Sequence, residues 1–256
     1  MVQSNPFLTA IREGKPQIGL WVSLGDALTT EVVASAGYDW LLLDMEHGAG
    51  ELSDVQAQLQ VVNGYDSTAI VRPDWNDPVK VKRLMDLGAP GLLFPMVQNA
   101  EEAAAAVAAT RYPPNGIRGF GGTTRATGFG RNNNYTTTVD DTTAVLVQVE
   151  SLQALEHVDA IASVDGVDGV FFGPADIAAD MGYLGQAMHD VVWAKILPAA
   201  MRLISKKIPV GTLVRDVAFA RRLLGAGFTF VACGSDAGLL ARAADTLLEE
   251  VKAPRL

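Results

Sequence analysis

Short apolar runs alternate with helix-like stretches from one end of this chain to the other. The runs predicted to be strands cover residues 18–24, 40–45, 68–72, 91–96, 144–149, 169–172, 210–214 and 229–233. The stretches predicted to be helices cover residues 30–36, 52–62, 78–87, 100–110, 154–164, 191–204, 216–224 and 237–251. Strands that are apolar throughout are typical of a parallel sheet with helices on both faces.

This alternation predicts an α/β fold, specifically a (β/α)8 TIM barrel that forms a single domain over residues 1–256. Gly37, Gly88 and Gly227 each follow a predicted helix, as C-cap glycines do. The alternative is a doubly wound open sheet. No strand is followed by the glycine fingerprint that would support it.

Residues 111–141 interrupt the alternation, because they show no clear strand or helix. A loop of this length in a compact domain is usually functional or disordered. It joins a predicted helix to the next strand, so it begins at the end of the barrel away from the expected active site. Its arginines and aromatic residues favour packing against protein, including a subunit interface, and contact with the active site stays open as the alternative.

Composition and charge narrow the class of protein. The net charge of -9 argues against a nucleic-acid partner and against an anionic membrane surface. The N-terminus has no signal-peptide pattern, and no apolar run approaches the ~20 residues needed to span a bilayer. The lone cysteine, Cys233, rules out an internal disulfide and fits a reducing compartment. We therefore expect a cytoplasmic protein.

Polar side chains able to do chemistry stand at or near the ends of the predicted strands. In a barrel of this type the working residues sit at the C-terminal ends of the strands. The candidates are Trp21, Asp44, His47, Arg72, Gln148, Glu150 and Asp176. Charge is rarely placed at the end of a buried strand without a partner, so we expect these groups to converge on one active site.

Glu150 and Asp176 follow adjacent predicted strands. Two carboxylates held close together repel unless a proton or a cation intervenes, and hard ions such as Mg²⁺ or Mn²⁺ prefer oxygen ligands. The pair is therefore a candidate metal site, the alternative being two separate acids that cap helices. The turn at Gly173, Pro174 and Ala175 leads into a helix and could hold a small carboxylate through backbone N–H groups, or could be an ordinary turn.

Two cationic candidates have two interpretations each. Arg72 could offer paired donors to an oxyanion, or could form an ion pair with Asp44 or Glu46, and both can hold. His47, oriented by Asp44, is a candidate general acid–base or a structural histidine. No lysine ends a predicted strand, which disfavours a Schiff-base mechanism and leaves metal-assisted carbonyl chemistry.

Taken together, these residues resemble the HpcH/HpaI family of class II, metal-dependent pyruvate aldolases. The matching segments, which span nearly the whole chain, are residues 19–21, 37–40, 44–48, 71–72, 113–114, 116–119, 148–150 and 173–176. The resemblance implies a carbon–carbon lyase. Such an enzyme cleaves a 4-hydroxy-2-keto acid to pyruvate or hydroxypyruvate plus an aldehyde, through an enolate stabilised by the metal.

The resemblance also implies roles for the candidates. Glu150 and Asp176 would ligate Mg²⁺, Mn²⁺ or Co²⁺. The substrate-binding residues would be Trp21, Arg72, Gln148 and the 173–175 turn (Gly173, Pro174 and Ala175). His47 would move protons through a water, with Asp44 and Asp86 as its partners, although the helix position of Asp86 also fits a subunit contact.

The family forms trimers and dimers of trimers, often with the last helix exchanged between subunits, which implies the same for residues 237–251. One departure concerns the aldehyde: many members follow the histidine with Ala-Pro-Asn-Asp, where this chain has Gly48-Ala49-Gly50-Glu51. Two alternatives stay open, namely oxaloacetate decarboxylation or another carbon–carbon bond-forming reaction on the same scaffold, and a non-enzymatic binding barrel.

Overall fold

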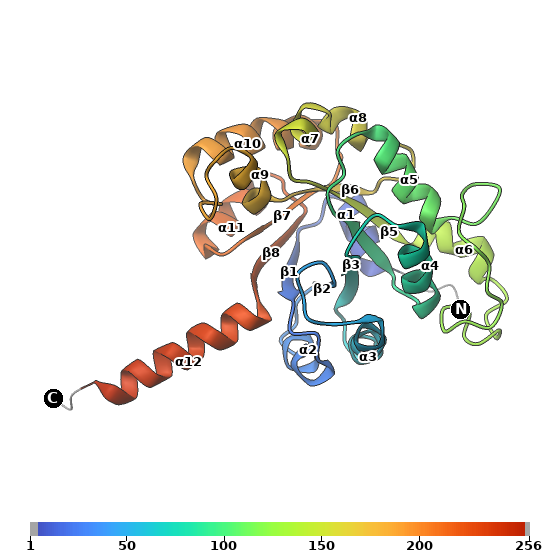
Figure 1. The fold of residues 1–256 in the computed structure, drawn as a ribbon, viewed down its shortest axis with the longest axis horizontal. Coiled ribbons are helices and arrows are strands. Elements are labelled where there is room, and N and C mark those ends of the chain that lie inside the picture. The colour runs from blue at the N-terminus through green and yellow to red at the C-terminus, as the bar shows by residue number, and fades with distance from the viewer. Residues whose placement is uncertain (1–4, 254–256) are drawn as a thin grey trace.

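The strands close into a parallel barrel in which each strand pairs with its neighbours in the sequence, β8 returning to β1 (Figure 1). The computed structural model describes residues 5–253. The strands are β1 Gln17–Val22, β2 Trp40–Asp44, β3 Thr68–Arg72, β4 Gly91–Phe94, β5 Ala144–Val149, β6 Gly169–Phe172, β7 Val210–Val214 and β8 Phe230–Ser235. The predicted TIM barrel is therefore confirmed, and the open sheet is excluded.

Most of the helices cover the outside of the barrel, whereas the first closes its N-terminal rim and the last projects away from it (Figure 1). The helices are α1 Pro6–Arg12, α2 Ala27–Ala34, α3 Leu52–Val62, α4 Pro78–Leu87, α5 Ala100–Thr110, α6 Tyr135–Thr142, α7 Leu152–Glu156, α8 Val158–Ala162, α9 Pro174–Asp180, α10 Asp190–Ser205, α11 Val217–Gly225 and α12 Asp236–Lys252. The single helix predicted over residues 154–164 is instead two short helices, which meet at His157.

Aromatic rings fill the inside of the barrel. Trp40 and Phe230 pack edge to face at 6.1 Å between centroids, and Phe171 links this pair to Trp21 near the C-terminal ends of the strands. Glycine makes room for them: a Cβ at Gly19 would lie 2.2 Å from the Trp40 ring. The interior is thus a packed core, and ligands are left to the rims.

The N-terminal rim is closed by α1, which the sequence pattern did not predict. Phe7 and Ile11 are buried in the interior cluster of the barrel. The Asn5 amide donates hydrogen bonds to the carbonyls of Pro90 (2.7 Å) and Thr142 (2.9 Å), just before β4 and β5. The C-terminal rim is therefore the end left for chemistry.

The prediction that residues 111–141 hold no helix was wrong at their end, because α6 begins at Tyr135. The remainder packs against the end of α4, where the Arg125 guanidinium donates to the Leu87 carbonyl at 2.5 Å. Ile117, Phe120 and Phe129 stay exposed on this loop. Within one chain the loop therefore lies at the N-terminal rim.

The last helix, α12, projects away from the barrel (Figure 1). Asp236 is its only buried residue among those described, and Leu240, Leu247 and Val251 are exposed. A helix with an unpaired apolar face is marginal in water by itself. Among residues 5–253, no helix is both long enough and apolar enough to cross a membrane.

Candidate active site

At the C-terminal rim, the Arg72 guanidinium is held between two carboxylates. Asp44 and Arg72 are register partners at the ends of β2 and β3, so their side chains start side by side. Arg72 donates through Nε (2.9 Å) and Nη2 (2.7 Å) to the two Asp44 oxygens, and its Nη1 lies 2.7 Å from Glu46 Oε2. Both expected interpretations of Arg72 stay compatible, because a guanidinium has five N–H donors and these contacts use only part of them.

Trp21 completes this cluster. Its indole N–H donates to Asp44 Oδ2 at 3.1 Å, and the Arg72 Cζ lies 5.1 Å from its ring centroid. Burial acts to raise the pKa of Asp44, but hydrogen bonds and charge from Arg72 outweigh it and hold that pKa below its usual range. Asp44 is thus a carboxylate that stays ionised, and its hydrogen bonds orient the Arg72 guanidinium.

The sequence predicts Glu46 only as an ion-pair partner of Arg72 and not as a site residue. Desolvation raises its pKa, the charge of Arg72 lowers it, and the nearby acids Asp44 and Asp176 raise it again, leaving a net increase. The signal that could have found it is its position two residues after Asp44, which returns it to the same rim.

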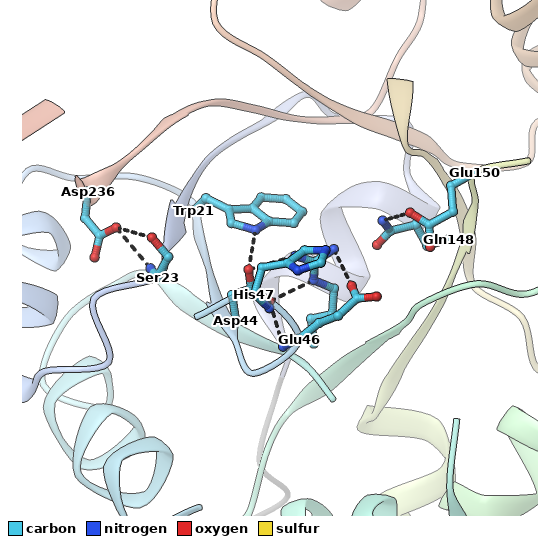
Figure 2. A network of polar contacts seen from close by, with 9 residues as sticks. Trp21, Ser23, Asp44, Glu46, His47, Gln148, Glu150 and Asp236 are labelled. Atoms are coloured by element: carbon cyan, nitrogen blue, oxygen red, sulfur yellow. Dashed lines mark hydrogen bonds and ion pairs between the residues drawn. The ribbon is translucent and has the colours of Figure 1, made fainter. Parts of the chain in front are cut away.

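The Glu150 carboxyl is buried on the other side of the site (Figure 2). It accepts the Met96 backbone N–H at 2.6 Å and an N–H of the Gln148 amide. Burial raises the pKa of Glu150 to about 7, and the charges of Glu46 and Asp176 add to this, against the hydrogen bonds. Burial makes it costly to ionise such a carboxyl group, and a cation bound next to it would stabilise the ionised form.

The surroundings of Glu150 fit a divalent metal. The side-chain oxygen of Gln148, Oε1, is buried and accepts no hydrogen bond from residues 5–253, so an unused acceptor lies beside the carboxylate. A Cβ at Gly173 would lie 2.8 Å from Glu150 Oε2, so this position needs glycine to leave space next to the oxygen. Oxygen acceptors with room for a hard ion are the donor set that Mg²⁺ and Mn²⁺ prefer.

Asp176 stands in the first turn of α9, and its side chain is exposed. It is close enough for its charge to raise the pKa of Glu150. Among residues 5–253, no three His, Cys, Asp or Glu side chains form a ready metal cluster. Two protein carboxylates with substrate and water oxygens remain a chemically sufficient set for an octahedral ion. In the same turn, Pro174 is buried and Ala175 is exposed.

His47 lies on the exposed loop after β2 (Figure 2). Its backbone N–H is 3.4 Å from Asp44 Oδ1, while the Asp44 side chain is committed to Arg72 and Trp21. Asp44 therefore holds the loop of His47 through its backbone. An action of Asp44 on the imidazole ring stays a prediction.

Asp86 is not brought to His47 within one chain. It lies in the last turn of α4, at the N-terminal rim, and accepts from Arg118 Nη2 at 2.7 Å. Arg118 is completely buried against Tyr112 and Tyr135. A catalytic role of Asp86 would therefore require a second subunit.

Comparison with known proteins extends these observations over the whole chain. The model of the HpcH/HpaI aldolase/citrate lyase family matches residues 17–243. A 4-hydroxy-2-oxo-heptane-1,7-dioate aldolase of Salmonella heidelberg (strain SL476) is 48% identical over 244 residues, 95% of this chain and 93% of that protein.

Solved structures of related proteins have the same fold. A HpcH/HpaI aldolase/citrate lyase family protein from Burkholderia cenocepacia J2315 superposes with a TM-score of 0.92 at 38% identity, covering 98% of this chain and 100% of that one. A citrate lyase beta subunit from M. tuberculosis, complexed with oxaloacetate and magnesium, shares the fold at a TM-score of 0.56 and 16% identity, covering 90% of this chain and 95% of that one.

The relatives confirm the aldolase class expected from the motifs, and with it an enzyme that acts on carbon–carbon bonds. The non-enzymatic barrel is accordingly set aside. The chain belongs to the HpcH/HpaI aldolase/citrate lyase family.

Proposed function

We propose that this protein is a class II aldolase that cleaves a 4-hydroxy-2-keto acid to pyruvate, or hydroxypyruvate, plus an aldehyde. The observation that carries the proposal is the buried Glu150 carboxyl, with its pKa raised to about 7, beside the unpartnered Gln148 oxygen and opposite Arg72. The relative named as a 4-hydroxy-2-oxo-heptane-1,7-dioate aldolase makes that dioate the first substrate to try.

Glu150 and Asp176 would hold one divalent ion, Mg²⁺, Mn²⁺ or Co²⁺. When bound, such an ion supplies Lewis-acid polarisation of the keto group of the substrate. The Gly173–Ala175 turn, in which Pro174 is buried, would receive the substrate carboxylate, and the buried Trp21 would contribute an apolar surface to the substrate site.

Arg72 would stabilise the oxygen that becomes negative as the bond breaks. Its clamp between Asp44 and Glu46 fixes the guanidinium before substrate arrives, and preorganised donors aimed at developing charge are a large source of catalysis. Gln148 would orient the same oxygen. His47, on the exposed loop, would act as a general acid–base and transfer protons to and from the aldehyde oxygen through a water molecule.

Assembly would complete the enzyme. We infer a homo-oligomer, a trimer or a dimer of trimers, in which α12 is exchanged between subunits and the single domain is formed by residues 1–256. The exposed Leu240, Leu247 and Val251 support a partner for α12, because nothing within residues 5–253 covers that apolar face. The remote position of Asp86 supports a contribution across subunits.

The test is turnover of 4-hydroxy-2-oxoheptane-1,7-dioate by purified protein, before EDTA, after EDTA and after add-back of Mn²⁺, with pyruvate as the readout. We expect activity to fall to background with EDTA and to return with Mn²⁺. Activity that ignores EDTA would contradict the proposal. Oxaloacetate is assayed in parallel, since the fold neighbour carries oxaloacetate; much faster turnover of oxaloacetate would assign decarboxylation instead.

A further inference from the structure

Asp236, the first residue of α12, is buried although the rest of that helix projects into solvent. Its carboxylate accepts the Ser23 backbone N–H at 3.0 Å, the Ser23 hydroxyl at 3.1 Å and the Leu24 backbone N–H at 3.2 Å. Figure 2 shows the pair formed by Asp236 and Ser23 on the side of the site opposite Glu150. The Asp236 carboxylate therefore links the start of α12 to the segment that follows β1.

These bonds do more than cap a helix. The N-cap of α12 is Ser235, whose hydroxyl oxygen accepts the Gly238 N–H at 3.2 Å. Within its own helix, the Asp236 carboxylate accepts the adjacent Ala237 N–H, at 2.7 Å. Its other bonds go to Ser23 and Leu24, more than 200 residues away in the chain, with separations of 213 and 212.

The segment that Asp236 holds supports the loop of His47. The Ser23 carbonyl accepts the Ala49 N–H at 3.1 Å. The two backbones touch again at Gly25 and Gly50, where a Cβ built on Gly25 would lie 2.7 Å from Gly50 Cα. The two loops are therefore in direct backbone contact there, so a shift of one is transmitted to the other.

The same segment follows Trp21, whose indole N–H fixes one oxygen of Asp44. Asp44 in turn accepts the backbone N–H groups of Glu46 (3.1 Å) and His47 (3.4 Å). The loop after β2 is therefore held from two directions: by Asp44 from inside the barrel, and by Ser23 from the side of α12.

We propose that Asp236 is a positioning residue of the active site: by fixing Ser23 and Leu24, it sets the place of the loop that carries Glu46 and His47, without touching substrate. The effect on catalysis rests on the function proposed above. A displacement of about 1 Å in catalytic geometry can cost on the order of 100-fold in rate, so this indirect support has measurable consequences.

The experiment compares Asp236→Asn and Asp236→Ala with the matched control Asp168→Asn. Asp168 also accepts a backbone N–H, that of Val145 at 2.9 Å, but lies before β6 at the opposite rim. The readouts are hydrogen–deuterium exchange of a peptide covering residues 45–50 without metal, kcat and KM for aldol cleavage, and Mn²⁺ affinity, all far below Tm and with the assembled mass checked by light scattering.

We expect both Asp236 variants to speed exchange in residues 45–50 and to lower kcat by roughly 10-fold or more, alanine more than asparagine because the amide keeps one acceptor. Mn²⁺ affinity should change by less than about 2-fold, since Glu150 and Asp176 follow β5 and β6, away from the segments that Asp236 contacts. Asp168→Asn should lower Tm without either effect.

Unchanged exchange and kcat in both Asp236 variants would overturn the proposal, as would a kcat loss that appears only when the assembled mass falls. Equal effects of Asp168→Asn would also overturn it, by showing a general loss of stability. If the wild type has no aldolase activity but the Asp236 variants still loosen residues 45–50, the positioning role stands and the proposed function fails.

Discussion

The side-chain amide of Gln148 donates to the Glu150 carboxylate, while its Oε1 is buried and accepts no hydrogen bond from any described residue. The two residues lie two positions apart at the end of β5 and therefore face the same side. This pairing leaves a buried acceptor next to an acid that resists ionisation, and it is the arrangement on which the predictions about the metal depend.

The first prediction concerns pH and the metal-free protein. The pKa of Glu150 rises from 4.5 to about 7 on folding, chiefly because of burial. A raised carboxyl pKa means that the folded state binds the extra proton, so stability falls as pH rises from about 4.5 to 7 and stays lower above pH 7. Without metal, Glu150→Gln should remove this loss.

The gain at pH 8 is at most about 3 kcal/mol, the equivalent of the whole shift. Denaturant unfolding in EDTA at pH 5.5 and pH 8 measures it: the wild type should lose stability between the two values relative to Glu150→Gln. Added Mn²⁺ should stabilise the wild type and leave the variant unchanged. Parallel pH profiles for the two proteins would contradict the assignment.

The second prediction concerns Arg72. Its removal leaves Asp44 and Glu46 buried or half-buried without their counter-charge, and breaking a buried ion pair typically costs about 3–5 kcal/mol. Arg72→Ala should therefore lower Tm, and should lower kcat by roughly 100-fold or more if the guanidinium stabilises developing charge. A change confined to KM would limit Arg72 to substrate binding.

The third prediction separates His47 from the metal side of the site. His47 is exposed on its loop, so His47→Ala should alter stability by no more than about 0.5 kcal/mol. Aldol cleavage should fall far more than exchange of the methyl protons of pyruvate, measured by NMR in D₂O. Equal loss in both assays would show that the work of His47 is not tied to the aldehyde.

Much of the fold was predictable because buried parallel strands are marked by their apolar runs. The predicted strand over residues 68–72 matches β3, and the ends of these strands locate the site. The missed elements carry weaker signals: α6 is rich in threonine, which favours helices poorly, and α1 is only seven residues long.

The details of the site depended on pairing that periodicity does not specify. Both Asp44 oxygens accept hydrogen bonds from Arg72 because the two residues are register partners on β2 and β3. The hydrogen bond from the Ser23 backbone N–H to Asp236 joins residues 213 positions apart, and no local sequence pattern indicates it. Asp86 was placed beside His47 by resemblance, whereas one chain holds it beside Arg118.

The last prediction tests the aromatic interior that supports the rim. A Cβ at Gly19 would lie 2.2 Å from Trp40, whose ring is completely buried and cannot withdraw without moving Phe7 and Phe230. Gly19→Ala should cost about 1–3 kcal/mol or more through overpacking. Gly225→Ala is the control, since, apart from its chain neighbours and the backbone of its own helix, no atom of residues 5–253 lies within 4 Å of a Cβ built there and the position is helical.

The control should be neutral or stabilise by up to about 1 kcal/mol, because alanine restricts the unfolded chain and suits a helix. Thermal unfolding of the two variants beside the wild type measures both effects. Because Trp21 packs edge to face on Trp40 at 6.4 Å, Gly19→Ala should also lower kcat at temperatures where the protein remains folded. A Gly19→Ala variant with wild-type Tm and kcat would show that the aromatic interior can rearrange at no cost. It would contradict the idea that this interior holds Trp21 and Arg72 in position.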